Sequence, residues 1–282
     1  GDIISEIVEI VFILEPKVNT YYLFHMSFPL ISVIMPCFNS ETYLINTVSS
    51  VIRQSYQNIE LIVVDYGSTD RSSEILSELS QQHPELTVFY QKNEGPYPAR
   101  NFALQYAKGE LIAFLDADDY WAPNCLEKLY NGMIQSNADL SYCGWQNVGK
   151  QTLISEPYIP PAYEIDDPAA AFLKSCPWPI HAALIRRSVL DSVEGFSERL
   201  FSSMDYDLWL RILAHTRNLV RVPEVLAYYR WHGKGQISAT RWRQVLDAIQ
   251  VRRDFVTHHP NMVKHLSSEE LYQLVDGQLL NE

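Results

Sequence analysis

The sequence predicts an α/β protein in which a doubly wound, mostly parallel central sheet is flanked by helices. Short apolar runs at residues 31–36, 61–64 and 111–114 have the length and composition of buried strands. Amphipathic helical patterns separate these runs, and strands that alternate with helices are typical of a parallel sheet. A smaller, irregular region and C-terminal helices are expected in the rest of the chain.

The first two strands are each expected to lead through a polar loop into a helix. After the first strand, Asn39 or Ser40 can cap a helix whose apolar residues recur at helical spacing. After the second strand, Ser68 or Thr69 can cap the next helix in the same way. The strand, loop and helix unit is therefore repeated.

Residues 86–90 alternate like a further strand, and residues 99–107 predict a helix that Gly109 ends. Ligands of doubly wound sheets bind beyond the carboxyl ends of the strands. Asn39, Asp65 and the acidic tetrad at 116–119 all fall at such ends, so we expect three loops to meet at one crevice.

The pattern is less regular after residue 120, where prolines interrupt short strands and turns. Helices are predicted at residues 124–135, 205–214, 242–256 and 267–280, and one or two strands at residues 220–229. We divide the chain into an extension (1–25), a domain (26–238) with a nucleotide-binding half (about 31–120) and an acceptor half (about 121–238), and a C-terminal helical segment (239–282).

The extension at residues 1–25 is left without a function. A short amphipathic helix is expected at residues 5–13, packed on the domain in preference to lying at a membrane surface. Met26 opens the strand pattern that follows.

Composition and charge exclude several classes of function. Apolar residues make up 47% and charged residues 20%, as in ordinary globular proteins. The formal charge of −12, with no run of lysine or arginine, argues against a nucleic acid partner. No apolar run approaches the roughly 20 residues that span a bilayer. The four cysteines form no CxxC pair and are interpreted as buried free thiols in a reducing cytoplasm: Cys37, Cys125, Cys143 and Cys176.

The tetrad Asp116-Ala117-Asp118-Asp119 directly follows a buried strand. Adjacent carboxylates repel one another unless a cation joins them, and oxygen ligands favour Mg²⁺ or Mn²⁺ over zinc. The alternative is an acidic turn that caps the following helix, and the tetrad alone favours neither interpretation.

The loop that begins at Asp65 could contact a nucleoside. Asp65 would accept hydrogen bonds from the base or ribose, with Tyr66 near the base, while Gly67 allows the chain to turn sharply. The alternative is an ordinary turn between a strand and a helix. Arg100, early in the next helix, could meet phosphate or a base carbonyl, and the alternative is a solvated surface arginine.

Two further positions could take part in catalysis. Asp205 begins a helix and could act as a general base, although an acidic residue in a first turn is also an ordinary partner of the helix dipole. His232 could ligate the metal or contact diphosphate, although an isolated histidine is more often structural.

Taken together, these segments resemble the inverting glycosyltransferases of family two, whose nucleotide-binding half has the GT-A fold. The resemblance covers roughly residues 32–238. It lies in the ordered motifs ISVIMPCFNSETYL, LIVVDYGSTDRS, NEGPYPARNFAL, GELIAFLDADDYWAP, GFSERL, DYDLWLR and YYRWHGKGQIS.

The resemblance implies a role for each matching position. Asp118 matches the ligand of the metal that bridges the donor diphosphate, and Asp116 matches the first carboxylate of that motif, near the ribose or the metal. Asp205 matches the catalytic base. The remaining positions implied to bind the nucleotide sugar are Pro36, Asn39, Asp65, Tyr66, Arg100 and Ala117, and His232 is assigned as a further metal ligand.

Three positions depart from the family pattern. Tyr66 stands where many members have a second aspartate that hydrogen-bonds uracil, so the identity of the base is open. Met204 replaces the acidic residue that often precedes the base, and His232 lies in a segment that varies between members.

The expected reaction is a metal-assisted, single in-line displacement that moves a sugar from a nucleotide diphosphate, with UDP-sugar favoured, to a saccharide or lipid-linked acceptor. Cell-envelope or polysaccharide synthesis is the expected setting. We expect a cytoplasmic protein, at the inner membrane face if the acceptor is lipid-linked, with acceptor contacts around Trp178 to His181. The alternatives are an inactive nucleotide-binding regulator or scaffold, and a nucleotidyltransferase. The nucleotidyltransferase is ranked last, because the loop after the first strand is neither glycine-rich nor basic.

Overall fold

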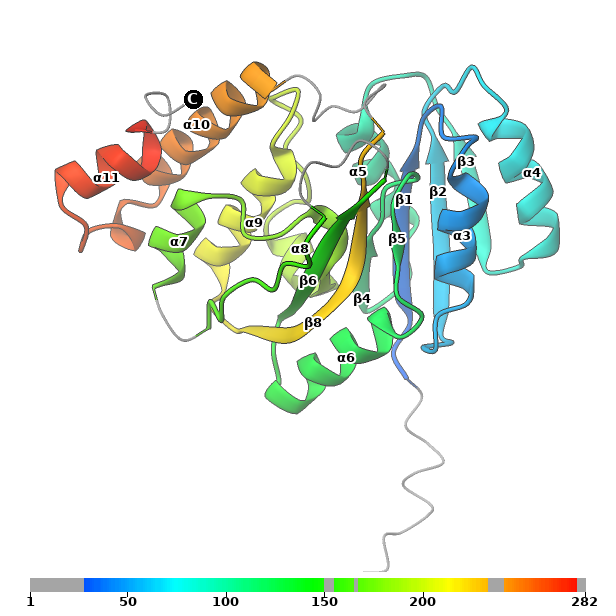
Figure 1. The fold of residues 1–282 in the computed structure, drawn as a ribbon, viewed down its shortest axis with the longest axis horizontal. Helices are drawn as coiled ribbons and strands as arrows, with labels where there is room; N and C mark the ends of the chain where they lie inside the picture. The colour runs from blue at the N-terminus through cyan, green and yellow to red at the C-terminus, as the bar shows by residue number, and fades with distance from the viewer. Residues whose placement is uncertain (1–27, 150–154, 165–166, 233–240, 278–282) are drawn as a thin grey trace, which may run out of the picture.

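A computed structural model describes residues 28–149, 155–164, 167–232 and 241–277 (Figure 1). The helix expected at residues 5–13, the strand pattern at Met26 and the last residues of the helix expected at 267–280 lie outside the described residues. Within them, eight strands form one mixed sheet in the order β3-β2-β1-β4-β7-β6-β8-β5. The α/β class, with a mostly parallel sheet between helices, is thus confirmed.

The first half of the sheet is entirely parallel, as the alternation of strands and helices predicts. It contains β1 (Ile31–Cys37), β2 (Ile59–Asp65), β3 (Leu86–Tyr90) and β4 (Leu111–Phe114). Cys37 pairs with Asp65, which pairs in turn with Tyr90, so three strands end at the same level. The loops that follow β1 and β2 therefore start side by side.

Helices α3 (Leu44–Ile52), α4 (Ser72–Gln82) and α5 (Pro96–Tyr106) connect these strands. In Figure 1, α3 lies in front of β1 and β2 while α5 lies behind them. Pro96 occupies the first turn of α5, where its missing N–H costs nothing, and Gly95 before it has a φ of 97° that favours glycine.

The second half of the sheet reverses direction at β7 (Ala183–Arg186), which is antiparallel to both β4 and β6 (Leu140–Val148). The region expected to hold one or two strands forms one, β8 (Leu219–Arg230), parallel to β6. The short β5 (Tyr120–Trp121) pairs with the far end of β8 and brings the tetrad loop to that strand.

The remaining helices surround this second half. They are α6 (Cys125–Ser136), α7 (Pro168–Lys174), α8 (Arg187–Ser192), α9 (Met204–His215), α10 (Arg241–His258) and α11 (Ser268–Val275), with 3₁₀ turns at Ile180–Ala182 and Pro260–Met262. Contacts of α10 with α9, and of α11 with α7, attach the C-terminal helices to the acceptor half. None of the helices that the structure describes could cross a membrane.

The predicted helix caps are wrong. Neither α3 nor α4 has a side-chain cap from Asn39, Ser40, Ser68 or Thr69. The backbone N–H of Ser72, at the start of α4, is instead bound by the carboxylate of Asp70 at 2.9 Å. The serine and asparagine side chains of the two loops bond across to one another, as described below.

The prediction for the cysteines is confirmed at three positions and wrong at one. Cys37, Cys125 and Cys143 are buried free thiols, whereas Cys176 is exposed and lines the pocket described next. Cys176 lies in the proline-containing segment between α7 and the first 3₁₀ turn.

Candidate donor and acceptor site

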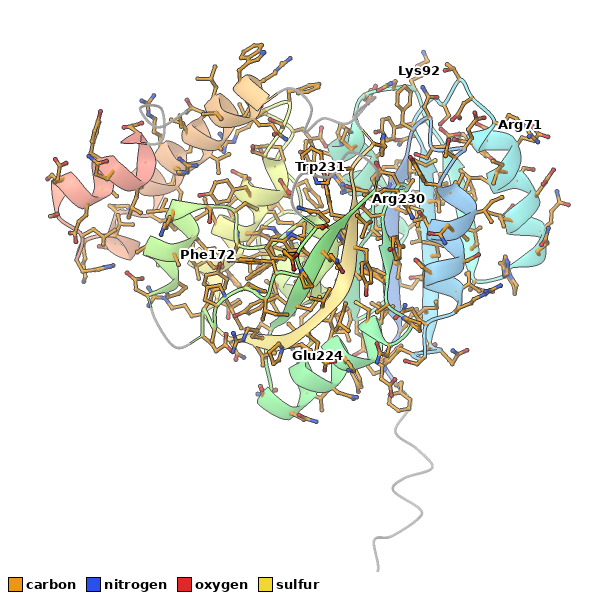
Figure 2. The ribbon with its side chains drawn as sticks, viewed as in Figure 1. Arg71, Lys92, Phe172, Glu224, Arg230 and Trp231 are labelled. Atoms are coloured by element: carbon orange, nitrogen blue, oxygen red, sulfur yellow. The ribbon has the colours of Figure 1, made fainter. Side chains whose placement is uncertain are left out.

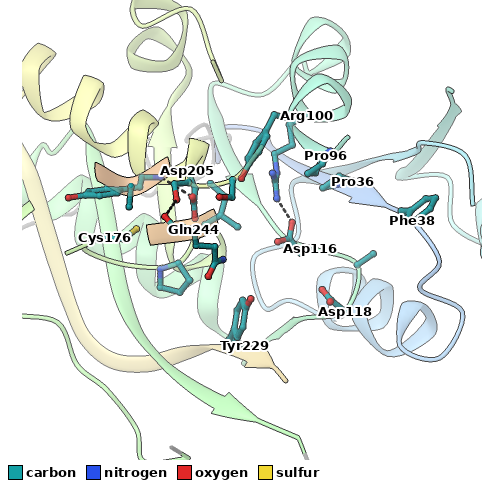
Figure 3. Close-up of a pocket in the computed structure, with 18 of the residues that line it drawn as sticks. Pro36, Phe38, Pro96, Arg100, Asp116, Asp118, Cys176, Asp205, Tyr229 and Gln244 are labelled. Atoms are coloured by element: carbon teal, nitrogen blue, oxygen red, sulfur yellow. Dashed lines mark hydrogen bonds and ion pairs between the residues drawn. The ribbon is translucent and has the colours of Figure 1, made fainter. Parts of the chain in front are cut away.

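A pocket of about 520 Å³ opens beyond the carboxyl ends of β1 and β4, where the sequence predicts a ligand crevice (Figure 3). Seven of the ten predicted site residues line it: Pro36, Tyr66, Arg100, Asp116, Ala117, Asp118 and Asp205. Asn39, Asp65 and His232 are not among the lining residues. The pocket is thus formed by loops that are far apart in the sequence.

Asn39 and Asp65 shape the loops. The Asn39 side-chain oxygen accepts a hydrogen bond from the backbone N–H of Thr69 at 2.8 Å, and the Asn39 N–H donates to the hydroxyl of Ser68 at 3.0 Å. Buried Asp65 accepts from the Ser68 N–H at 2.9 Å and from the hydroxyl of Ser73. Both side chains therefore help to hold the loops after β1 and β2 in place.

Aromatic rings form the surface of the pocket at these loops. The rings of Phe38 and Tyr66 are stacked, with centroids 5.3 Å apart and planes within 17°. Such a pair offers a flat apolar face to a planar group. Sequence reasoning placed Tyr66 near a base but missed Phe38, although an aromatic residue directly after a strand end was visible.

Arg100 and Asp116 form an ion pair at the centre of the pocket (Figure 3). The Arg100 guanidinium lies 5.4 Å from the ring centroids of both Tyr97 and Phe196, and its side chain is almost fully buried. A buried cation held by two rings and a carboxylate has a fixed position. The interpretation of Arg100 as a solvated surface residue is therefore wrong.

Asp118 faces His232 rather than the other carboxylates. The His232 Nε2 lies 2.9 Å from the Asp118 Oδ2, and the two side chains are 20% and 26% exposed. Arg230 and Trp231, labelled in Figure 2, precede His232 at the end of β8. An exposed carboxylate oxygen and an imidazole nitrogen at this distance could both bind one cation.

Asp119, the last carboxylate of the tetrad, points into the protein. Its Oδ1 accepts the backbone N–H of Arg230 at 2.7 Å, and its Oδ2 lies 3.3 Å from the Nδ1 of His181. Burial, followed by the charges of Asp118 and Asp116, raises the pKa of Asp119 well above its ordinary value. Asp119 therefore ties the tetrad loop to the end of β8.

His181 is fully buried, and burial lowers its pKa to about 4, so the imidazole is neutral at pH 7. Trp178, fully buried as well, stacks on Tyr142 with centroids 4.3 Å apart. Both side chains belong to the core, and the predicted place of the acceptor loops around this segment stays a prediction. Between them, Pro179 and Ile180 do line the pocket.

Thr47 fixes the tetrad loop from the helix α3. Its hydroxyl is fully buried and is shared between the backbone carbonyls of Ala117, at 3.0 Å, and Asp119, at 2.7 Å. A threonine inside a helix often bonds to its own helix, but this one bonds to a loop 70 residues later. Sequence reasoning missed it, since a threonine on a buried helical face resembles ordinary core packing.

Asp205 lies on the opposite side of the pocket from Asp118 and Phe38 (Figure 3). Ser203, just before α9, has a φ of 61°, and the Tyr97 hydroxyl accepts the Met204 N–H at 3.4 Å. These features set the first turn of α9, which presents Asp205 to the pocket. Met204 itself is fully buried, which explains why an apolar residue is accepted before the predicted base.

The pKa of the Asp205 carboxyl is raised above its ordinary value of 3.8, mainly by burial. The nearby Asp116 charge acts in the same direction, whereas the Arg100 charge and the Tyr206 N–H, at 2.9 Å, act against it. A carboxylate that is costly to keep ionised is a stronger proton acceptor than an ordinary aspartate.

The C-terminal helix α10 forms part of the pocket wall. Gln244, Val245 and Ala248 line the cavity on the side of Asp205, and Figure 3 shows Gln244 next to that residue. The segment that the sequence separates from the domain at residue 239 thus contributes to the same site.

The side chains of Asp118 and His232 are chemically suited to hold a divalent cation that is bound together with substrate phosphates. The described residues contain no cluster of three or more His, Cys, Asp or Glu side chains that could hold a metal by themselves. Asp118 and His232 supply two donors, and Mg²⁺ or Mn²⁺ commonly completes its coordination with substrate phosphates and water. Asp116 is engaged with Arg100, so its predicted part in metal binding stays a prediction.

Fold and site together define an α/β protein with an acidic pocket beyond the carboxyl ends of its parallel strands. Comparison with known families is consistent with this class: the model of "Glycosyl transferase family 2" matches residues 32–193. The chain belongs to this family of glycosyltransferases.

Two curated relatives match most of the chain. A UDP-Glc:alpha-D-GlcNAc-diphosphoundecaprenol beta-1,3-glucosyltransferase, WfgD of Escherichia coli, is 31% identical over 80% of this chain and 87% of its own length. The putative teichuronic acid biosynthesis glycosyltransferase TuaG of Bacillus subtilis is 30% identical over 82% and 90%. Relatives of this protein therefore act in the synthesis of cell-envelope polysaccharides.

Among solved structures, S. aureus TarS in complex with UDP-GlcNAc is similar in fold. Its TM-score is 0.70 at 22% identity, and the match covers 88% of this chain and 71% of the chain of TarS residues 1–349. The expected GT-A type of fold is confirmed by this neighbour.

Proposed function

We propose that this glycosyltransferase moves a hexose from a nucleotide diphosphate sugar to an acceptor hydroxyl, with inversion at the anomeric carbon. One observation supports this most directly: a single pocket has Asp118, which is paired with His232, at one end and the carboxylate of Asp205 at the other. The proposed phosphate site and the proposed proton acceptor thus lie at opposite ends of one pocket, whose volume is about 520 Å³.

Asp205 is proposed as the general base. Its raised pKa lets it take the proton of the acceptor hydroxyl while that oxygen attacks the sugar carbon. The bond from that carbon to the diphosphate oxygen breaks in the same step, so the configuration inverts.

Asp118 and His232 are proposed to hold a divalent cation together with the diphosphate, and that cation would stabilise charge on the leaving group. Arg100, held by Asp116 and two rings, adds a fixed positive charge between the two ends of the pocket. Phe38 and Tyr66 would receive the base by stacking.

UDP is the favoured nucleotide and a lipid diphosphate-linked sugar the favoured acceptor. The support is that the relative WfgD is named for UDP-Glc as donor and an undecaprenyl diphosphate-linked sugar as acceptor, and that TarS binds UDP-GlcNAc. Such an acceptor would lie in the part of the pocket between Asp205 and α10.

Calorimetric titration of UDP, GDP and dTDP with and without Mn²⁺ tests the donor site. We expect metal-dependent binding of UDP by the parent protein and its loss in Asp118→Ala. No binding of any of the three nucleotides under either condition would overturn the assignment.

The variant Asp205→Asn tests the role of the base. It should bind the nucleotide as the parent does and lose sugar transfer, because the amide cannot accept the proton. Normal turnover by this variant would refute the role. Nucleotide binding by the parent without transfer to any acceptor would instead favour an inactive, regulatory or scaffolding member, which the departures at Tyr66 and Met204 first suggested.

A further inference from the structure

Three exposed apolar side chains lie beside the acceptor end of the pocket. Trp242 is 68% exposed, Leu246 is 50% exposed and Phe201 is 47% exposed. Large apolar groups left in water at neighbouring positions commonly mark an interaction surface. We call these three residues the apolar patch.

The apolar patch is built on the same segments that line the pocket. Trp242 and Leu246 are four residues apart on α10, so they share one face of the helix, while Gln244, Val245 and Ala248 face the cavity from another. Phe201 directly precedes Ser202 and Ser203, which also line the cavity. The patch therefore lies at the rim of the pocket near Asp205.

An arginine links the two parts of the patch. The Arg243 guanidinium lies 4.2 Å from the centroid of the Phe201 ring, and the Arg243 residue is exposed. Arg243 thus brings a cation to the patch, while Asp247 of the same helix accepts hydrogen bonds from the backbone N–H and the hydroxyl of Ser202 at 2.9 and 2.7 Å. The patch therefore combines three exposed apolar side chains with the cation of Arg243, in a chain whose net charge is −12.

We propose that the apolar patch docks on an anionic lipid bilayer and brings the pocket to the level of the lipid headgroups. Exposed tryptophan, leucine and phenylalanine side chains enter the boundary between headgroups and acyl chains, and a neighbouring arginine binds anionic lipid. This inference rests on the proposed function, in which the acceptor sugar is linked to a lipid by a diphosphate. Such a sugar stands only a short distance from the bilayer, so the pocket rim must approach that surface.

Co-sedimentation with phosphatidylcholine vesicles, with and without phosphatidylglycerol, tests the proposal. The parent protein should bind the anionic vesicles and release them as salt is raised. The double variant Trp242→Ser with Leu246→Ser should bind about tenfold more weakly or worse. Arg243→Gln should weaken binding to the anionic vesicles alone. Ile45→Ser, which changes an exposed apolar residue on α3, is the matched control and should bind like the parent.

Two further measurements separate the possible failures. Calorimetry of UDP with Mn²⁺ should be unchanged in the double variant, because neither residue lines the pocket. A parent protein that binds UDP but not anionic vesicles, or a double variant that binds vesicles normally, overturns the docking surface and leaves the proposed function intact. A parent that binds vesicles but no nucleotide contradicts the proposed function alone. Sedimentation velocity without lipid should show the same mass for parent and double variant, and a dimer lost in the variant would assign the patch to a second copy.

Discussion

Replacing Thr47 with valine tests how the tetrad loop is held in place. Valine has nearly the shape of threonine and is also branched at Cβ, so the packing of α3 should change little. The change removes one hydroxyl group, which is fully buried and shared between the carbonyls of Ala117 and Asp119. Two carbonyl oxygens of the loop that carries Asp118 then lose that donor.

The cost follows from the burial of this hydroxyl. A buried polar group left without its partner costs about 1–3 kcal/mol, so Thr47→Val should lower the free energy of unfolding by about 2 kcal/mol. For a chain of this size, about 2 kcal/mol corresponds to a melting temperature lower by about 4–8 °C. Thr47→Ser keeps the hydroxyl and loses one methyl group, which costs about 1 kcal/mol in a packed core.

The two variants separate loop positioning from core packing. Thermal unfolding gives their stabilities, and calorimetry of UDP with Mn²⁺ gives their affinities. We expect Thr47→Val to bind the nucleotide more weakly than Thr47→Ser, because the Asp118 carboxylate is less well held. Equal affinity and equal stability of the two variants would show that the hydroxyl does not support the loop.

Two more predictions concern the charges around Asp205, the proposed general base, and the packing of the sheet. Burial raises the pKa of Asp205, so activity should be lost as pH falls through a value above 3.8, and ionised Asp205 should destabilise the fold at higher pH. In a pH–rate profile the acidic limb should move to higher pH in Arg100→Gln and to lower pH in Asp116→Asn. An acidic limb at the same pH in both variants would show that the charges of Arg100 and Asp116 do not set the pKa of Asp205. Gly109→Ala places a Cβ 2.6 Å from the backbone nitrogen of Ser32 in β1, so its free energy of unfolding should fall by about 1–3 kcal/mol. The free energy of unfolding of Lys108→Ala should stay near that of the parent. Equal free energies of unfolding for the two variants would refute the close approach.

The parallel half of the sheet could be predicted because short stretches of sequence are enough to identify its strands and helices. Each of the buried runs of β1, β2 and β4 stands between turn residues, and alternation with helices leaves few possible topologies. The helix caps could not be predicted in this way. Asn39 and Ser68 have the right chemistry for a cap, but they bond to each other's loop once the strand ends lie side by side.

Residues that line the pocket could be predicted where they belong to a sequence motif. They were missed where only tertiary packing brings them to the pocket. Asp118 and Asp205 could be identified from their motifs, whereas α10 enters the wall through contacts that no local pattern shows. The acceptor loops were predicted around Trp178 to His181 from their position in the chain alone. The Trp178 ring itself packs in the core, where it lies against Tyr142 and Trp209.

The three carboxylates of the tetrad differ in what surrounds them, and this difference explains how they coexist. Asp116 has the cation of Arg100, and Asp119 is buried against the Arg230 N–H and His181. Asp118 is partly exposed and faces the imidazole of His232. The Arg100 cation offsets the charge of Asp116, whereas burial and the two neighbouring charges raise the pKa of Asp119. Asp118 is the carboxylate that we propose to meet a cation arriving with the phosphates. A sequence shows three equivalent aspartates, but only the fold assigns them unequal partners.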